Sequence, residues 1–367
     1  MAQEQALAQV PNEVAHRRAI RIWLGVVAAL VFVMVIVGGA TRLTDSGLSI
    51  VEWRPVTGAL PPLTEAQWLV ELEKYRQIPE YQIINKGMSL DEFKFIYWWE
   101  WSHRQLGRLI GIAFALPLAF FWWRGWLEPK LKPKLLGLLV LGGSQGAIGW
   151  WMVSSGLVGR TDVSQYRLAL HLTLATIILL AIIWVMRGLS PPRRSDPRGA
   201  RAMVVGTILL GLIVFQVFLG GLVAGLDAGL SHTTWPLMDG HFIPPMADLY
   251  IMMPRWVNHF ENVMTVQFQH RMLAYAILLI ALFHMADLSR RDGPAAWRAT
   301  ALAALVLGQA AIGVMTLLLM VPLWAGLLHQ GMAMVLMAMA AVHVHALRRD
   351  RRAAAAIRPQ GAILATA

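Results

Sequence analysis

The chain has 367 residues, of which 57% are hydrophobic and only 14% are charged, and its formal net charge is +11. These proportions lie outside the range of soluble globular proteins and predict an integral membrane protein. The positive charge is spread over the connections between apolar segments. It therefore indicates topology and contact with anionic membrane lipid, and we expect no nucleic-acid partner.

Eight apolar runs are long enough to cross a bilayer of roughly 30 Å, which requires about 20 helical residues. They begin near Ile22, Trp98, Leu135, Arg167, Met203, Val263, Thr300 and Pro322. We therefore expect an all-α membrane protein with eight transmembrane helices. The first run follows basic residues, as the core of a signal peptide would, but it continues to Ala40 and we interpret it as a retained helix.

Basic residues recur on alternate connections, at positions 17–21, 124–134, 187–201, 290–298 and 348–358. Because short loops rich in Lys and Arg stay in the cytoplasm, we predict that both termini are cytoplasmic, in a bacterial inner membrane. The two longest connections, at about 41–97 and 225–262, then lie on the outer side. The chain contains no cysteine, so neither connection can hold a disulfide.

The sequence also contains an internal duplication. GGATRLTDSGLS, which begins at Gly38, aligns without a gap with GGLVAGLDAGLS, which begins at Gly220. Further matches join His103-Arg104 to His270-Arg271, QGAIG from Gln145 to QAAIG from Gln309, and His171 to His329. Each half has four spans, so both halves have the same orientation. We expect two pseudo-symmetric four-helix bundles, formed by residues 1–190 and 191–367.

Four of the spans carry one histidine near the outer end, namely His103, His171, His270 and His329. The helical rise of 1.5 Å per residue puts all four imidazoles roughly 8 to 10 Å below the outer surface. A histidine in a lipid-spanning helix is costly and indicates a functional site. Two imidazoles that face each other across a bundle suit the two axial positions of heme iron. We predict one heme in each half. The alternatives are hydrogen-bonded structural histidines and a zinc site, which usually needs four converging ligands.

The first histidine of each pair has polar neighbours. Arg104 and Arg271 directly follow it, and they either bind a heme propionate or reach the interface or a loop carboxylate. Three residues before it, the first half has Glu100 where the second has Gln267. Since residues i and i+3 share a helix face, we expect Glu100 to face the same cofactor as His103 and to relay protons or stabilise positive charge. This asymmetry assigns the chemistry to the first half.

On these motifs the sequence resembles the heme A synthase family, membrane enzymes that oxidise a methyl group of heme O to the formyl group of heme A. The motifs are GGATRLTDSGLS with Trp53, Glu100-x-x-His103 with Arg104, QGAIG with His171, and their second-half counterparts. The resemblance implies heme O as substrate between His103 and His171, with Glu100 and these two histidines as catalytic residues. It implies heme b as cofactor between His270 and His329.

The resemblance further implies several partners. These are heme O synthase, cytochrome oxidase assembly factors, an electron acceptor of unknown identity and a second copy of the chain. Some family members carry a cysteine pair in the first outer loop, and its absence here resembles the proteobacterial and mitochondrial branch.

Two other classes of protein share part of this pattern. A di-heme b-type cytochrome that takes electrons from a quinol would need the same four histidines, but it would place its hemes near both membrane faces. A transporter would show internal repeats but needs no matched histidine pairs. Because all four histidines lie near one face, the pattern favours the synthase.

Overall fold

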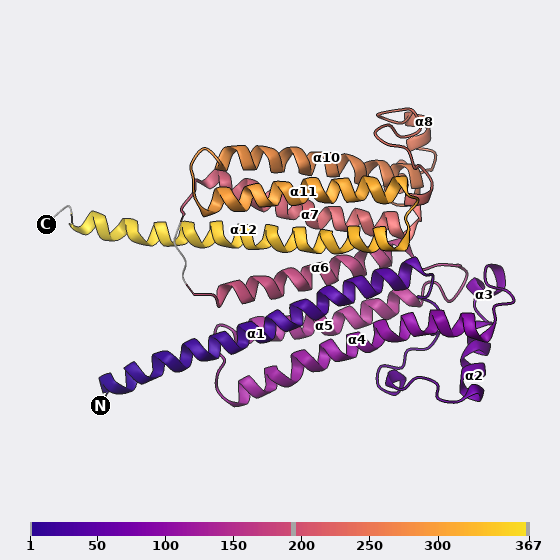
Figure 1. Cartoon of the computed structure of the whole chain (residues 1–367), viewed down its shortest axis with the longest axis horizontal. Helices are drawn as coiled ribbons and strands as arrows, with labels where there is room; N and C mark the ends of the chain where they lie inside the picture. The colour runs from indigo at the N-terminus through magenta and orange to yellow at the C-terminus, as the bar shows by residue number, and fades with distance from the viewer. Residues whose placement is uncertain (1, 192–195, 365–367) are drawn as a thin grey trace.

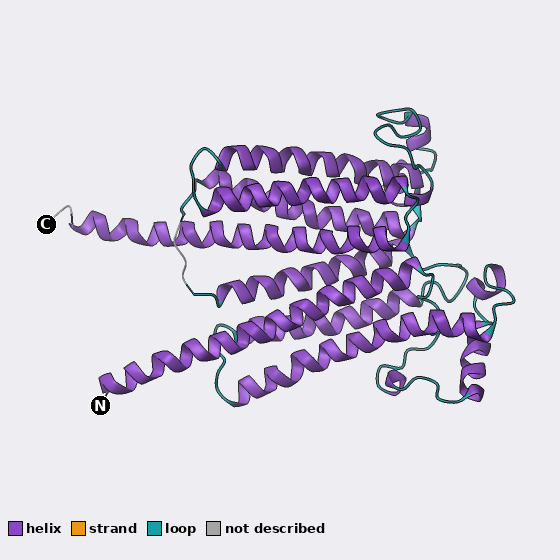
Figure 2. Ribbon diagram, viewed as in Figure 1, coloured by secondary structure: helices purple, strands orange, loops and turns teal. Residues whose placement is uncertain are grey.

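The computed structural model describes residues 2–191 and 196–364, with side chains for 13–191 and 196–355. Arg193, Arg194 and the side chain of Arg358, which belong to the predicted basic connections, lie outside these ranges. The described part of the chain is built from helices and the loops that join them, and no strand is assigned in it (Figure 2).

Eight helices in the described ranges are long and apolar enough to cross a membrane, which confirms the all-α, eight-span prediction. They are α1 (Ala2–Leu43), α4 (Leu90–Trp123), α5 (Lys132–Val153), α6 (Gln165–Gly188), α7 (Ala200–Gly225), α10 (Val263–Leu288), α11 (Pro294–Leu318) and α12 (Leu323–Leu364). The apolar spans within α1 and α12 cover Glu13–Leu43 and Leu323–Ala355. The beginning of α1 and the end of α12 lie at the same end of the molecule (Figure 1).

The long helices contact one another in two rings. In the first half, α1 and α5 each contact both α4 and α6, and in the second half α7 and α11 each contact both α10 and α12. The halves meet through α6 with α7 and through α12 with α1 and α6. One apolar core runs through this junction and includes the buried Leu24, Leu209 and Met337. The division of the chain at residue 190 stays a prediction.

Arg42, at the end of α1, joins the two halves at the end of the molecule that carries the long connections. Its guanidinium pairs with Asp45 at 3.0 Å, with Asp162 at 2.8 Å and with Asp227 of the second half at 2.9 Å. It also donates a hydrogen bond to the carbonyl oxygen of Ala224 at 3.0 Å. A single cation therefore balances carboxylates from three connections.

Helices α6 and α7 approach each other closely near Arg42. A Cβ atom built on Gly221 would lie 2.7 Å from the Cα of Ala169, and one built on Gly225 would lie 2.6 Å from the Cα of Gln165. Small residues allow helix backbones to approach each other in this way, so these glycines set the spacing of the two halves.

The second membrane helix begins earlier than predicted. The apolar run begins near Trp98, but α4 begins at Leu90, where Ser89 and Glu92 form a reciprocal capping box. The additional turns are amphipathic, and their Phe93 and Tyr97 pack into an apolar cluster with Trp68 of the first long connection. His103 therefore lies in the fourth turn of its helix, whereas the other three histidines lie in the second turn of theirs. Hydropathy does not detect an extension that is stabilised by a cap and by packing outside the membrane.

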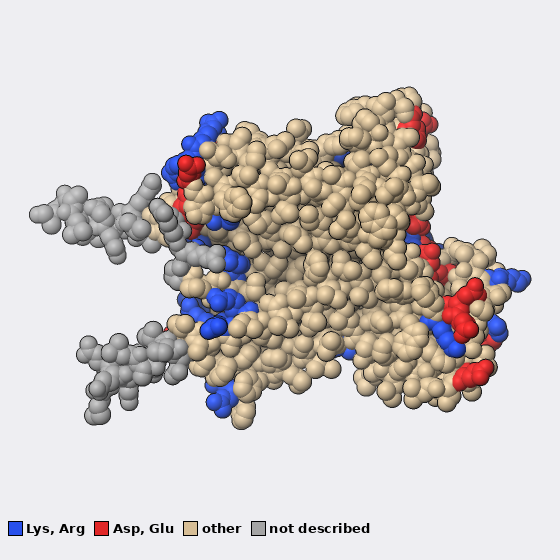
Figure 3. All heavy atoms as spheres, viewed as in Figure 1, with Lys and Arg blue, Asp and Glu red and all other residues tan. Residues whose placement is uncertain are grey.

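Both long connections contain short helices. The first has η1 (Thr57–Ala59), α2 (Glu65–Tyr75) and α3 (Pro79–Ile83), and the second has η2 (Ala228–Leu230), α8 (Met246–Leu249), η3 (Arg255–Val257) and α9 (Asn258–Glu261). Acidic and basic residues are mixed over the first connection, whereas Lys and Arg gather at the opposite end of the molecule (Figure 3).

Glu80, in α3, is buried in this outer segment with only 5% of its surface exposed. The hydroxyl of Tyr75 donates to its carboxylate at 3.2 Å, and burial raises the pKa of Glu80 to about 8. An acid whose pKa is higher in the folded state than its unfolded value of about 4.3 stabilises the fold fully below that lower value. The contribution is lost as the pH rises through about 8.

We therefore expect the segment 57–90 to be cleaved faster by a protease at pH 9 than at pH 5, and Glu80→Gln to remove most of that difference. Glu73→Gln is the matched control, because the Glu73 side chain in α2 is 60% exposed. Cleavage of the unmodified protein at one rate across this pH range would contradict the assignment.

Candidate functional site

Each of the four histidines packs against a glycine from a neighbouring helix of its own half. The pairs are Gly38 with His103, Gly149 with His171, Gly220 with His270, and Gly313 with His329. A Cβ atom on these glycines would lie 3.0, 2.9, 3.3 and 2.7 Å from the respective imidazole rings. The helices that carry the two histidines of each half, α4 with α6 and α10 with α12, belong to the same ring of contacting helices. The structure therefore brings together the pairs that the sequence predicted.

Three of the histidines also share a glutamine contact that the sequence analysis missed. In each case the glutamine lies four residues before the glycine, and its Nε2 atom donates to the backbone carbonyl of the histidine at 2.9–3.0 Å. The same Nε2 atom lies 3.2–3.5 Å from ring nitrogens of that histidine. The glutamines are Gln145, Gln216 and Gln309, which contact His171, His270 and His329 in that order. Each Oε1 atom is buried without a hydrogen-bond partner.

These features fit heme better than a small metal ion. Two imidazoles from helices of one bundle could hold heme iron, and glycines leave room where side chains would otherwise press on the rings. The unpartnered Oε1 atoms are acceptors for a hydrogen bond from the N–H group that a histidine keeps on one ring nitrogen when the other binds iron. Among the described residues, no group of three or more His, Cys, Asp or Glu side chains could hold an ion, so the zinc alternative lacks ligands there.

Arg104 and Arg271 fasten the outer connections to the histidine-bearing helices. Arg104 donates to the carbonyl oxygens of Ile50 at 2.7 Å and Glu52 at 2.8 Å. Arg271 donates to the same positions of the duplicated motif, the carbonyl oxygens of His232 at 2.6 Å and Thr234 at 2.9 Å. The duplication therefore extends to individual hydrogen bonds. The predicted contact with heme propionates stays a prediction.

Glu100 is 2% exposed, and its two carboxylate oxygens are both engaged. One accepts hydrogen bonds from the Ser49 hydroxyl at 2.8 Å and the Ile50 backbone N–H at 2.7 Å, and the other pairs with Arg104 at 2.6 Å. An ion pair with added hydrogen bonds is what makes a buried carboxylate tolerable. Glu100 thus joins the outer connection, Arg104 and the helix of His103 into one polar network.

Gln267 occupies the equivalent position in the second half, but it donates hydrogen bonds to the connection where Glu100 accepts them. Its Nε2 atom donates to the carbonyl oxygens of Ala228 at 2.9 Å and His232 at 3.1 Å. The first half therefore presents a charged acceptor to the connection, and the second presents a neutral donor. The Glu-to-Gln difference thus changes the hydrogen bonds to the connection, while the catalytic role of Glu100 stays a prediction.

A further histidine pair was also missed. The Nε2 atoms of His284 and His343 lie 2.8 Å apart, and both residues are buried, with at most 1% of their surface exposed. His284 follows His270, and His343 follows His329, by the same number of residues. This separation is about four helical turns, so the later histidine lies on nearly the same helix face as the predicted ligand. That spacing was the available signal. Pro117 and Val185 occupy the corresponding positions in the first half.

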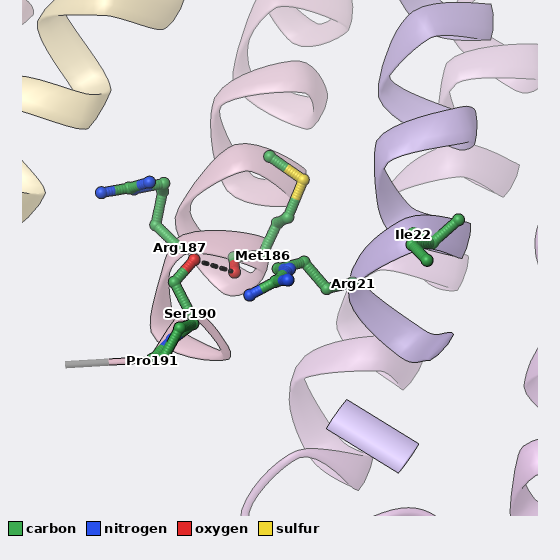
Figure 4. A pocket seen from close by; sticks show the side chains of 6 residues that line it. All are labelled: Arg21, Ile22, Met186, Arg187, Ser190 and Pro191. Atoms are coloured by element: carbon green, nitrogen blue, oxygen red, sulfur yellow. Dashed lines mark hydrogen bonds between the residues drawn. The ribbon is translucent and has the colours of Figure 1, made fainter. Parts of the chain in front are cut away.

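The cavity in Figure 4 lies away from the four predicted ligands. It has a volume of about 380 Å³ and is lined by Arg21, Ile22, Met186, Arg187, Ser190 and Pro191, from α1 and from α6 and the residues after it. His171 lies near the beginning of α6, whereas Met186 lies in its last turn. The cavity therefore belongs to the opposite end of the molecule and not to a predicted heme site.

Comparison with known proteins agrees with the geometry. A family model described as cytochrome oxidase assembly protein matches residues 21–341, which include all four histidines, Glu100 and both arginines. Heme A synthase of Azorhizobium caulinodans is 55% identical over 348 residues, which cover 95% of this chain and 99% of that protein. The chain belongs to the heme A synthase family. Heme A synthases of Agrobacterium fabrum and Mesorhizobium japonicum are 53% and 54% identical over at least 90% of both chains.

Membership of the heme A synthase family decides between the classes left open by the sequence. It favours a synthase over a quinol cytochrome or a transporter, and it is consistent with a multi-pass membrane enzyme. The similarity extends over both halves of the chain.

Proposed function

We propose that this protein oxidises a methyl group of heme O to the formyl group of heme A in its first half, residues 1–190. The observation that carries the proposal is the pair of imidazoles, His103 and His171, on the same helix bundle as the buried Glu100–Arg104 ion pair. Water or dioxygen supplies the oxygen atom. With water, a methyl group and one water molecule give a formyl group, four protons and four electrons, and an electron acceptor takes up the electrons.

In this proposal His103 and His171 hold the substrate, and Glu100 accepts and passes on protons at its carboxylate oxygens. Arg104 balances the charge of the carboxylate and, through the carbonyl oxygens of Ile50 and Glu52, fixes the outer connection over this site. A positioned general base typically contributes a rate factor of about 100 to 10,000. The heme O that enters requires a prenylating synthase upstream, and the heme A that leaves requires assembly factors that deliver it to an oxidase.

We assign the second half, residues 191–367, to a resident heme b held by His270 and His329. Bound heme b would supply one-electron redox chemistry. Gly220 and Gly313 leave the rings room, and Arg271 holds the connection above them through its contacts with residues 232 and 234. Gln267 offers no carboxylate there, so this half lacks the proposed proton acceptor.

Absorption spectra and extracted pigment of the purified protein test the proposal. We expect heme b together with heme O, heme A or an oxidised intermediate. Heme b alone, with reduction by a quinol, would show a quinol cytochrome, and the absence of any heme would contradict both heme assignments.

We also propose that the protein lies in a bacterial inner membrane with both termini in the cytoplasm. A reporter fused to the carboxyl terminus should be cytoplasmic, and one inserted after the exposed Lys86 should be on the outer side. A reporter after Lys130, between α4 and α5, is the control for a cytoplasmic loop. The topology is wrong if the Lys86 and Lys130 reporters report the same side.

A further inference from the structure

The glutamine contacts are distributed unequally between the halves. Both predicted heme b ligands, His270 and His329, have a glutamine that binds the ligand's own carbonyl and reaches its ring. In the first half only His171 has one. We call this paired contact the glutamine clamp; its members are Gln145, Gln216 and Gln309.

His103 is the ligand without a clamp. The residue four positions before its glycine is Met34, which stands where Gln216 stands in the duplicated helix α7. The terminal methyl of Met34 packs toward Gly107, where a Cβ atom would lie 3.4 Å from it. Within the described residues, the His103 side chain has no hydrogen-bond partner. A thioether is at most a weak acceptor and cannot replace the amide donor.

The His103 ring is also turned differently. The rings of His171, His270 and His329 present Cε1 as the atom closest to the neighbouring glycine. His103 instead presents Nε2, at 3.0 Å from a Cβ atom built on Gly38, followed by Cδ2 at 3.4 Å. The missing clamp therefore coincides with a different orientation of the imidazole.

We propose that the glutamine clamp sets how long heme stays bound, and that unclamped His103 is the axial ligand that releases when substrate enters and product leaves. This inference rests on the proposed function. A resident cofactor requires two ligands that stay bound, whereas a substrate that must be exchanged requires one ligand that dissociates. The clamps follow this division, with two in the second half and one in the first.

The physical basis is the control of ligand orientation by a second hydrogen-bonding group. Such partners typically contribute about 10- to 100-fold in metal affinity or activity when they are removed. The Nε2 atom of the glutamine holds the ring relative to the helix backbone. The same atom lies 3.2–3.5 Å from ring nitrogens of that histidine, so the bound amide restricts rotation of the imidazole. The clamping glutamines are thus positioning residues, since they act through the histidines.

The test measures transfer of heme from the purified full-length protein to an excess of apomyoglobin. In Gln216→Met and Gln309→Met we expect heme b to be lost about 10- to 100-fold faster. In Met34→Gln, loaded with heme O, we expect heme O to be lost about tenfold more slowly, with heme b loss unchanged. Gln269→Met is the matched control, because Gln269 adjoins His270 in sequence but donates to the carbonyl oxygen of His259.

The proposal would be overturned by an unchanged rate of heme b loss in both Gln216→Met and Gln309→Met. An unchanged rate of heme O loss in Met34→Gln would also overturn it. If a methionine variant does not fold, Gln216→Glu keeps the shape and the acceptor. It should shift the heme b midpoint potential to more negative values, because a carboxylate makes the ligating imidazole more basic. No shift would again count against the clamp. Failure of the proposed function looks different, since the unmodified protein would then yield no heme O, heme A or oxidised intermediate.

Discussion

Glu100→Gln is expected to abolish most heme A formation while the content of heme b stays near that of the unmodified protein. The amide keeps the shape of the side chain but cannot accept a transferred proton and carries no charge opposite Arg104. Loss of a general base typically lowers a rate by about 100- to 10,000-fold. The measurement is the amount of heme A extracted from cells that are supplied with heme O, together with the heme b absorption of the purified variant.

Two controls separate this chemistry from the structural role of Glu100. Ser49→Ala removes one of its hydrogen bonds and leaves the carboxylate and Arg104 in place, so heme A formation should fall by much less. Gln267→Glu places a carboxylate at the matching position of the second half and should not create a second active site. If Glu100→Gln forms heme A at the unmodified rate, or if Ser49→Ala is equally inactive, the catalytic assignment is wrong.

His270→Ala and His329→Ala are each expected to remove heme b, because each deletes one of its two proposed ligands. The helices should remain inserted, since alanine is apolar and the other residues of α10 and α12 are unchanged. The measurement is the ratio of heme b to protein after purification, with the low-spin spectrum as a second readout. His241→Ala, in the exposed part of the second long connection, is the control and should keep its heme b. A complete heme b spectrum in both ligand variants would exclude this pair.

Much of the fold could be predicted, because apolar length and the number of helical residues that cross a bilayer are properties of the sequence alone. The start of α4 could not, because the cap at Ser89 and the packing of Phe93 against the outer connection lie beyond the reach of hydropathy. The histidine pairs were predictable because the duplication places equivalent side chains on equivalent helices.

The environment of those histidines was less accessible from sequence. A glutamine four residues before a glycine is an ordinary spacing until α5, α7 and α11 are seen to bring it against an imidazole. The contacts of Arg104 and Arg271 depend on loop shape: Asp45 and Asp227 occupy matching left-handed positions, with φ of 48° in each, in connections whose further sequences differ. The sequence pattern selected the candidate residues, and the folded loops determined which atoms they contact.

The pairing of Arg42 with Asp227 across the halves has a consequence for their separation. A first half produced alone would keep Arg42 but lose Asp227, and a second half produced alone would keep that carboxylate without its cation. The separated second half would also leave Gly221 and Gly225 as a groove with no helix to fill it. Separation would therefore leave Arg42 with Asp45 and Asp162 of its own half, but it would leave Asp227 without this cation and uncover the surface at Gly221 and Gly225. Two halves that share these contacts can differ in their predicted heme sites while they remain packed together.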